Sequence, residues 1–221
     1  MRTLGFYHVY LVNHWQEIVM EQIVKIMRSG LYDQSTVIHI GCLGRDEEVA
    51  KLREMLKDHK KFVINFHSAV PDHFEFCTLR LLQDRSRSAE PFYAFYIHTK
   101  GVTWPKEKTK AYIGGTYWRQ YMNYYIISRW KECMNRLDAG HDTCGVKLLT
   151  KKDMPAFRVH YSGNFFWCKS TYIRTLPLIE HLRLKDRFQA EFWIGSGDPL
   201  CATLCQEFVD YNTQKKWVDP A

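Results

Sequence analysis

Short apolar runs alternate with amphipathic stretches through the first hundred residues. A short apolar run predicts a strand, and apolar residues three or four positions apart predict a helix. Strands are expected at 6–12, 36–40, 62–66 and 92–97, and helices at 16–28, 46–58 and 74–82. The fourth strand is apolar at consecutive positions, which is typical of strands covered on both faces in a parallel sheet. The first half therefore predicts a β-α-β-α-β-α-β layer.

The second half begins with a change of composition. Residues 101–115 are rich in Lys, Thr, Pro and Gly, which predicts a long loop that closes as a lid on a Gly114-Gly115 hinge. Aromatic residues at helical spacing predict one long helix over 117–137, with its aromatic face in the core. Further strands are expected at 146–149 and 164–167, and helical segments at 170–176, 189–194 and 200–211. The chain is thus expected to form a single α/β domain over 1–221.

Composition agrees with one folded domain. The 221 residues are 46% hydrophobic and 15% aromatic, which excludes disorder as the main state. Lysine and arginine number 31 against 24 acidic residues, and the net charge of +7 favours an anionic ligand without choosing one. Seven cysteines form neither a CxxC pair nor a Cys/His cluster, so a zinc site is not expected. No signal peptide or long apolar segment is found, and a cytoplasmic protein with free thiols is expected.

Polar residues follow the predicted strands, at the edge where parallel sheets bind ligands. Loops are polar in most proteins, but a set drawn from several strands to one edge favours a polar small-molecule site with donors suited to phosphate. The candidate binding residues are Asn13, Trp15, His98, Thr99, Lys100, Gly101, Ser162, Gly163 and Asn164.

Three charged residues stand out as candidates for chemistry. Lys100 ends an apolar strand beside a glycine and is suited to neutralise a diphosphate, unless it is a solvated loop lysine like its neighbours at 106, 108 and 110. Asp142 and Glu191 lie among apolar or aromatic residues, a setting that suits a general base. A hydrogen-bonded structural carboxylate is the alternative for each. The sequence has no phosphate-binding GxxxxGK[ST], no complete dinucleotide fingerprint and no GxSxG.

Four blocks of sequence together resemble small glycosyltransferases of bacteria and large algal viruses. They are YHVYLVNHW at 7–15, SGLYD at 29–33, YIHTKG at 96–101 and HYSGNFFW at 160–167. IHTKG and HYSGNFFW are the most specific, and the resemblance spans most of the chain. It implies a GT-A-like, three-layer α/β/α sandwich with a mostly parallel central sheet. Residues 1–101 would form the nucleotide-binding half and residues 102–221 the acceptor-binding half.

The resemblance also implies a nucleotide-sugar donor, a UDP-sugar first of all, and a glycan, lipid-linked or other hydroxyl acceptor. It implies Glu191 as the base on the acceptor hydroxyl, and places Asn13 and Trp15 near the nucleobase. Most GT-A enzymes hold Mn²⁺ or Mg²⁺ on an Asp-x-Asp motif after the fourth strand, where this chain has His98-Thr99-Lys100. Either the lysine replaces the metal, or the metal takes ligands elsewhere, such as His98 or Asp142.

Two other functions compete with this expectation. A non-catalytic nucleotide- or carbohydrate-binding module of the same fold would account for the missing Asp-x-Asp motif. A nucleic-acid-binding protein would account for the net charge, but the basic residues are spread along the chain and no recognised motif is present. No nucleic-acid partner is therefore expected.

Overall fold

A computed structural model of the chain describes residues 1–88, 90–106, 110–150 and 158–206. Its strands, in chain order, are β1 (Arg2–Tyr10), β2 (Ser35–Leu43), β3 (Phe62–Ser68), β4 (Phe92–His98), β5 (Thr143–Gly145), β6 (Leu148–Leu149), β7 (His160–Tyr161), β8 (Phe166–Lys169) and β9 (Cys201–Thr203). Its helices are α1 (Trp15–Arg28), α2 (Leu31–Gln34), α3 (Asp46–Leu56), α4 (Phe76–Ser88), α5 (Lys110–Asn123), α6 (Trp130–Asp138), α7 (Ser170–Ile173) and α8 (Phe188–Trp193).

In the described residues, seven strands form one sheet in the order β3-β2-β1-β4-β8-β5-β9. Neighbouring strands run parallel except at β8, which is antiparallel to both β4 and β5. The first four strands of the chain form one side of this sheet, and β8, β5 and β9 continue it without a break. The predicted α/β fold with a mostly parallel central sheet is confirmed.

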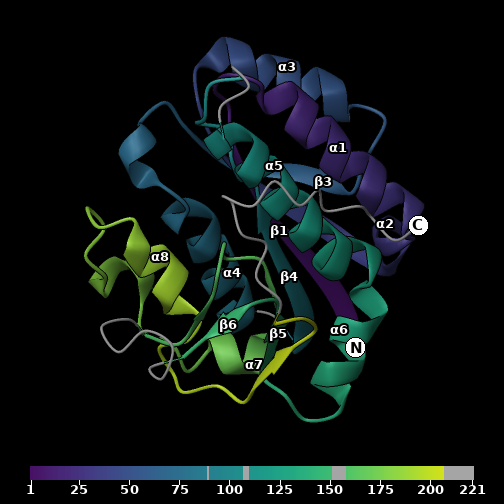
Figure 1. The fold of residues 1–221 in the computed structure, drawn as a ribbon, viewed down its shortest axis with the longest axis vertical. Helices are drawn as coiled ribbons and strands as arrows, with labels where there is room; N and C mark the ends of the chain where they lie inside the picture. The colour runs from purple at the N-terminus through teal and green to yellow at the C-terminus, as the bar shows by residue number, and fades with distance from the viewer. Residues whose placement is uncertain (89, 107–109, 151–157, 207–221) are drawn as a thin grey trace.

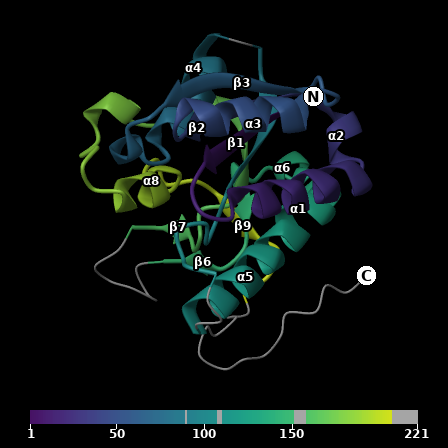
Figure 2. The same cartoon turned by 90° about the horizontal axis from the view of Figure 1, so that it is seen from above.

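Two layers of helices cover the sheet, because successive side chains of a strand point to opposite faces. Leu4 and Phe6 of β1 belong to the apolar layer packed with α4, α7 and α8. Tyr7 and Val9 belong to the opposite layer, packed with α1, α3, α5 and α6. Figures 1 and 2 show these layers from two directions. The three-layer arrangement leaves the ends of the strands, rather than their faces, as the place where a ligand has access.

The described parts of the predicted lid and of the predicted long helix differ from the expectation, and residues 107–109 of the lid lie outside the described part of the chain. Helix α5 begins at Lys110, so Gly114 and Gly115 lie inside a helix and the expected hinge there is wrong. A π-helical turn over Tyr124–Ser128 then separates α5 from α6. Position 115 is a glycine for a packing reason: a Cβ built there would lie 1.4 Å from the Trp104 ring.

The predicted helix over 200–211 is also wrong where the structure describes it. Residues 201–203 form β9, which pairs in parallel with β5. A free sheet edge beside a short strand offers ladder hydrogen bonds that outweigh the local helical pattern. Residues 207–211 of that prediction lie outside the described part of the chain.

The cysteines behave as small apolar residues. All seven are free, and Cys42 and Cys168 are fully buried. Burial raises the pKa of the Cys42 thiol to about 12, so it stays protonated and unreactive at neutral pH. Among the described residues, none of the helices has both the length and the apolar character that a membrane crossing needs.

Candidate functional site

A pocket of about 310 Å³ opens beyond the carboxyl ends of β1, β2 and β4. This volume is at the lower end of the range for small-molecule sites, roughly 300–1,000 Å³. Strands β1 and β4 and the turn after β4 supply most of the wall, and α8 closes it from the second half of the chain. The predicted residues that line it are His98, Thr99, Lys100, Gly101 and Glu191.

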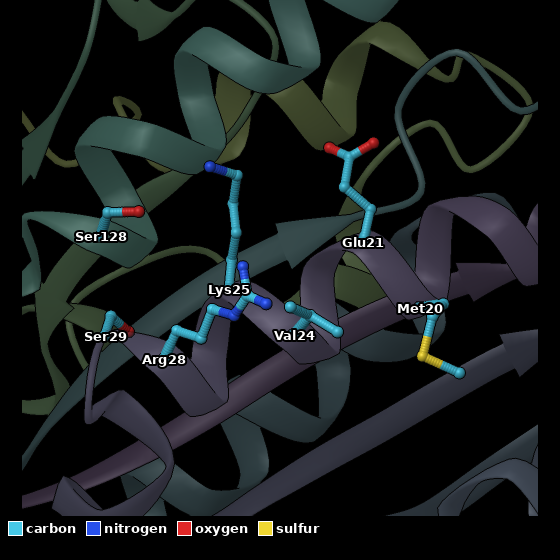
Figure 3. Close-up of a pocket in the computed structure, with 7 residues that line it drawn as sticks. All are labelled: Met20, Glu21, Val24, Lys25, Arg28, Ser29 and Ser128. Carbon is cyan, nitrogen blue, oxygen red and sulfur yellow. The ribbon is translucent and has the colours of Figure 1, made fainter. Parts of the chain in front are cut away.

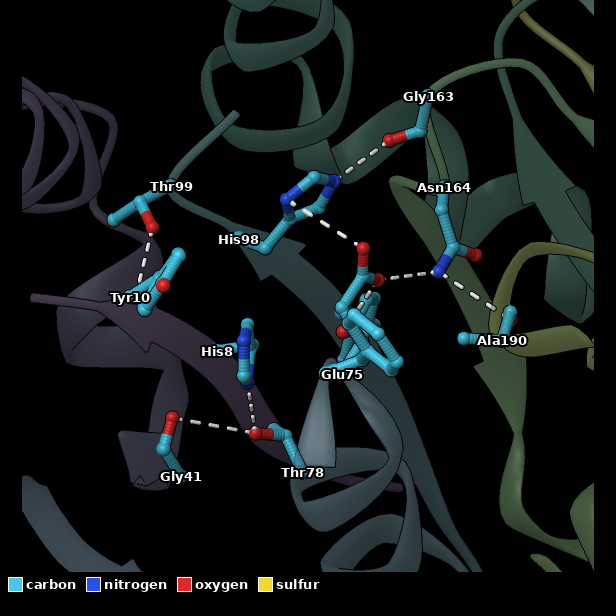
Figure 4. A network of polar contacts seen from close by, with 12 residues as sticks. His8, Tyr10, Gly41, Glu75, Thr78, His98, Thr99, Gly163, Asn164 and Ala190 are labelled. Atoms are coloured by element: carbon cyan, nitrogen blue, oxygen red, sulfur yellow. Dashed lines mark hydrogen bonds and ion pairs between the residues drawn. The ribbon is translucent and has the colours of Figure 1, made fainter. Parts of the chain in front are cut away.

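Hydrogen bonds fix the chain where β4 ends. The Tyr10 amide donates to Thr99 Oγ1 at 3.0 Å (Figure 4). The Thr99 amide donates to the His8 carbonyl at 3.1 Å. Behind this turn, Arg119 donates to the Lys100 carbonyl and to Glu21 Oε2, both at 3.0 Å. Arg119 is only 4% exposed. The turn that carries Lys100 is therefore held by a buried guanidinium on α5.

Lys100 brings an uncompensated positive charge to the pocket. Its ammonium forms no ion pair or hydrogen bond within the described part of the chain, and the side chain is half-buried. Together with the larger effect of burial, this charge lowers the pKa of His98 to about 3. A cation that forms no ion pair, at the end of a parallel sheet, is suited to an anionic ligand.

One ring nitrogen of His98 forms a hydrogen bond, and the other forms none with a described residue. Its Nε2 lies 2.9 Å from the Gly163 carbonyl oxygen, which only accepts, so the proton of the neutral ring is on Nε2. Gly163 has φ +83°, and a Cβ there would meet Met122 at 2.5 Å, so a side chain would displace this carbonyl. The Nδ1 atom of His98 faces Glu75 Oε1 at 3.9 Å, beyond hydrogen-bond distance (Figure 4).

Glu75 is the site residue that the sequence analysis missed. It lies just before α4, and its Oε2 accepts hydrogen bonds from the Tyr96 hydroxyl at 2.8 Å and from Asn164 Nδ2 at 2.7 Å. The carboxylate is held from β4 and from the loop before β8, while the side chain remains 20% exposed at the pocket. Glu75 falls within the helix predicted over 74–82 rather than at a strand exit, so no signal in the sequence leads to it.

Glu191 and Arg187 close the pocket from the second half of the chain. Glu191 lies on α8, and its carboxylate forms no hydrogen bond or ion pair with any described residue. Arg187 is exposed, and its guanidinium lies over the Phe188 ring at 4.9 Å. The pocket thus combines two cations, Lys100 and Arg187, with two carboxylates, which suits a ligand that carries both phosphate and hydroxyl groups.

Five of the predicted binding residues do not line the pocket: Asn13, Trp15, Ser162, Gly163 and Asn164. Asn13 donates to the Val102 carbonyl at 3.0 Å and so steadies the turn after β4. Trp15 is 2% exposed in the core, and its Nε1 donates to Glu48 Oε2 at 2.6 Å, so its ring packs inside the protein and its place beside a nucleobase stays a prediction. The Ser162 amide donates to the Lys147 carbonyl, and its neighbour Asn164 acts on the pocket through Glu75.

Asp142 lies at the other end of the sheet. It directly precedes β5, which runs parallel to β9, and its Oδ2 accepts a hydrogen bond from the Leu200 amide at 2.9 Å. Its backbone also pairs with Leu200 and Lys169. Asp142 therefore lies outside the pocket that Glu191 lines, and its contacts favour the structural alternative, while its catalytic role stays a prediction.

The pocket does not fit a divalent metal in the way that the resemblance implies. Position 100, after β4, carries an ammonium where a second carboxylate is expected. His98 Nε2 is occupied by the Gly163 carbonyl, and Glu75 Oε2 already accepts two hydrogen bonds. Among the described residues, no three His, Cys, Asp or Glu side chains gather as metal ligands. No chemical step is therefore assigned to Mn²⁺ or Mg²⁺.

A second hollow, of about 510 Å³, runs along the outer side of α1 (Figure 3). Met20, Val24 and Arg28 of α1 line one wall, and Ser128 of the π-helical turn lines another. None of the predicted site residues reaches it. The pocket at the carboxyl ends of the strands is therefore the candidate functional site.

Comparison with known protein families places most of the chain in one of them. No curated protein matches the sequence. Residues 6–185 match the model of a family described as "Domain of unknown function (DUF8361)". This match begins within β1, includes β2 to β4, the Lys100 turn and Glu75, and ends just before α8. The chain therefore belongs to the DUF8361 family.

Proposed function

We propose that this protein is a glycosyltransferase that moves a sugar from a nucleotide-sugar donor, a UDP-sugar in the first place, to a hydroxyl of a glycan or lipid-linked acceptor. The observation that carries the proposal is the meeting of Lys100 and Glu191 in one pocket at the carboxyl edge of the sheet. Neither charge has a partner among the described residues. Lys100 is suited to the departing diphosphate, and Glu191 is suited to the incoming hydroxyl.

Lys100 would stabilise the leaving group. In sugar transfer the bond to the diphosphate breaks through an oxocarbenium-like state, and negative charge develops on the phosphate oxygens. An ammonium fixed beside those oxygens lowers the barrier more than it stabilises the bound donor, because its partner charge grows as the bond breaks. The hydrogen bond from Arg119 to the Lys100 carbonyl keeps this turn in place before the donor binds.

Glu191 would take the proton of the acceptor hydroxyl. Its carboxylate is not engaged by described side chains, so both oxygens remain available to an incoming hydroxyl. The half-buried Trp104 lines the same pocket and packs on Gly101 and Gly115, which limits the entry of water that would otherwise hydrolyse the donor.

The arrangement of the two halves supports a GT-A-like organisation. His8, Glu75 and Lys100 come from residues 1–101, and Glu191 comes from residues 102–221. A pocket between these halves is what donor binding on one side and acceptor binding on the other require. The continuous sheet order across both halves is compatible with a single catalytic domain.

A thermal-shift screen of the full chain against UDP-, GDP-, CMP- and dTDP-sugars tests the proposal, with Mn²⁺ and with EDTA in parallel. A ligand that binds only the folded state raises the melting temperature. We expect a rise with one nucleotide class that persists in EDTA. A flat response to every nucleotide sugar, together with no hydrolysis of any of them, would refute a nucleotide-sugar enzyme.

Glu191→Gln separates an enzyme from a binding module. An enzyme that uses this carboxylate as its base should lose about 10²–10⁴-fold in turnover and keep its donor affinity. Glu54→Gln, the same change on the exposed face of α3, is the control and should keep both. Donor binding with no turnover in the unaltered chain would favour the binding module.

A further inference from the structure

Two hydrogen-bond acceptors face one another in the pocket with no donor between them. Glu75 Oε1 and His98 Nδ1 are 3.9 Å apart, and both residues line the cavity (Figure 4). The other atom of each group is already occupied: Glu75 Oε2 by Tyr96 and Asn164, and His98 Nε2 by the Gly163 carbonyl. The two free acceptors are therefore held in fixed positions from several elements.

The protonation state of His98 keeps this arrangement as two acceptors. A proton on Nδ1 would turn the contact with Glu75 into an ion pair. Burial, and after it the charge of Lys100, lowers the pKa of His98 to about 3, so the ring is neutral at physiological pH. With its single proton on Nε2, Nδ1 offers only a lone pair.

We infer that Glu75 Oε1 and His98 Nδ1 form a sugar-binding subsite that holds two adjacent hydroxyl groups of the transferred sugar. A vicinal diol presents two O–H donors side by side, and two acceptors 3.9 Å apart accept one hydrogen bond from each. A hydroxyl replaced by hydrogen would leave one of the two acceptors without a donor once the sugar covers it, so the subsite also discriminates against deoxy sugars.

The position of the pair assigns it to the donor sugar. His98 ends β4, two residues before Lys100, and the sugar ring is the group bonded directly to the diphosphate that Lys100 is proposed to bind. This assignment rests on the proposed function. The presence of two facing acceptors does not depend on the proposed function. It predicts affinity for a diol whatever the rest of the ligand is.

Glu75→Gln tests the subsite because the substitution preserves the acceptor at the Oε2 position and replaces the acceptor at the Oε1 position by a donor. Tyr96 and Asn164 both donate to Oε2, so the amide oxygen of Gln must take that place and its NH₂ must replace Oε1. The variant keeps its supporting hydrogen bonds but presents a donor where the ligand hydroxyl needs an acceptor. Loss of the negative charge by itself would strengthen phosphate binding, so a charge effect has the opposite sign.

The affinity of each nucleotide sugar that binds is compared with that of the corresponding bare nucleoside diphosphate by calorimetry. In Glu75→Gln we expect a loss of about tenfold or more for the nucleotide sugar, with no loss for the bare diphosphate. Glu54→Gln serves as the remote control. Unchanged affinity for the nucleotide sugar, or equal losses for both ligands, would overturn the subsite. An unchanged melting temperature of the variant confirms that it is folded.

A second measurement keeps the subsite testable if no nucleotide sugar binds and the proposed function fails. The full chain labelled with ¹⁵N in histidine is titrated with the methyl glycosides of glucose, galactose and mannose at tens of millimolar. A shift of the His98 Nδ1 signal with a glycoside, lost with its deoxy analogue, supports the subsite. No shift with any of the three overturns it.

Discussion

The indole ring of Trp104 occupies the space that a side chain at position 115 would fill. A Cβ at Gly115 would lie 1.4 Å from one ring carbon of Trp104 and 2.2 Å from another. Gly101 is the second support, since a Cβ there would lie 3.2 Å from the same ring. Because Trp104 also lines the pocket, a glycine inside helix α5 sets the position of one wall of the candidate site.

Gly115→Ala should therefore damage the pocket although alanine favours helices. The methyl group has to displace the indole ring, and the cost of such overpacking, about 1–3 kcal/mol, exceeds the gain of up to about 1 kcal/mol in helix propensity. We expect a lower melting temperature and weaker ligand binding in the thermal-shift screen. Gln120→Ala, on the same helix, is the control. A variant at Gly115 that is more stable than the unaltered chain would contradict the packing argument.

The buried guanidinium of Arg119 should be essential for folding stability. Arg119→Met keeps most of the side-chain volume but leaves Glu21 without its cation and the Lys100 carbonyl without its donor. We expect a loss of about 2–4 kcal/mol in the free energy of unfolding in urea. Arg80→Met, which breaks an exposed pair with Glu180, should cost about 1 kcal/mol or less. Equal losses of unfolding free energy in the two variants would show that the burial of Arg119 does not make its ion pair more important for stability.

Lys100 and Glu75 both line the pocket, but the sequence alone predicts only Lys100 as a site residue. Lys100 follows a strand of consecutive apolar residues, and the rule that ligands lie beyond such strands leads to it directly. Glu75 becomes a site residue through Tyr96, 21 positions away, and Asn164, 89 positions away. No local pattern predicts those contacts, because they depend on where β4 and β8 meet in the sheet.

The position of Trp15 could not be predicted from the sequence for the same reason, because it depends on contacts between distant segments. Trp15 follows a predicted strand, just as Lys100 does, but it is also the first residue of α1 and faces the layer between α1 and the sheet. Periodicity predicts that α1 exists and which face is apolar. It does not decide whether a large ring at the helix start points into the core or toward the strand ends, because that depends on the packing partner. Here the partner is Glu48 of α3.

Stability should fall as the pH falls below about 6.5, partly because of His8. Burial, opposed by the Glu75 charge, lowers the pKa of His8 to about 4 in the folded chain. Between about pH 6.5 and the pKa of His8 in the folded chain, His8 is protonated in the unfolded chain and neutral in the folded chain. This costs up to about 1.4 kcal/mol per pH unit and vanishes above the unfolded pKa. His8→Asn keeps a hydrogen-bonding group beside Thr78 Oγ1 but cannot take up a proton, so it should show a smaller difference between the free energies of urea unfolding near neutral pH and in mild acid.

Lys100→Met should weaken the binding of nucleoside diphosphates by about tenfold to a hundredfold, because it removes a charge-assisted contact that no other part of the turn replaces. Lys106→Met makes the same change six residues further on, at an exposed lysine paired with Glu17, and should leave the affinity within about twofold. The salt dependence provides an independent readout. Affinity for UDP should fall with added salt in the unaltered chain and less steeply in Lys100→Met. Similar losses in both lysine variants would mean that the general positive charge of the protein attracts the ligand, and that the pocket holds no specific phosphate contact.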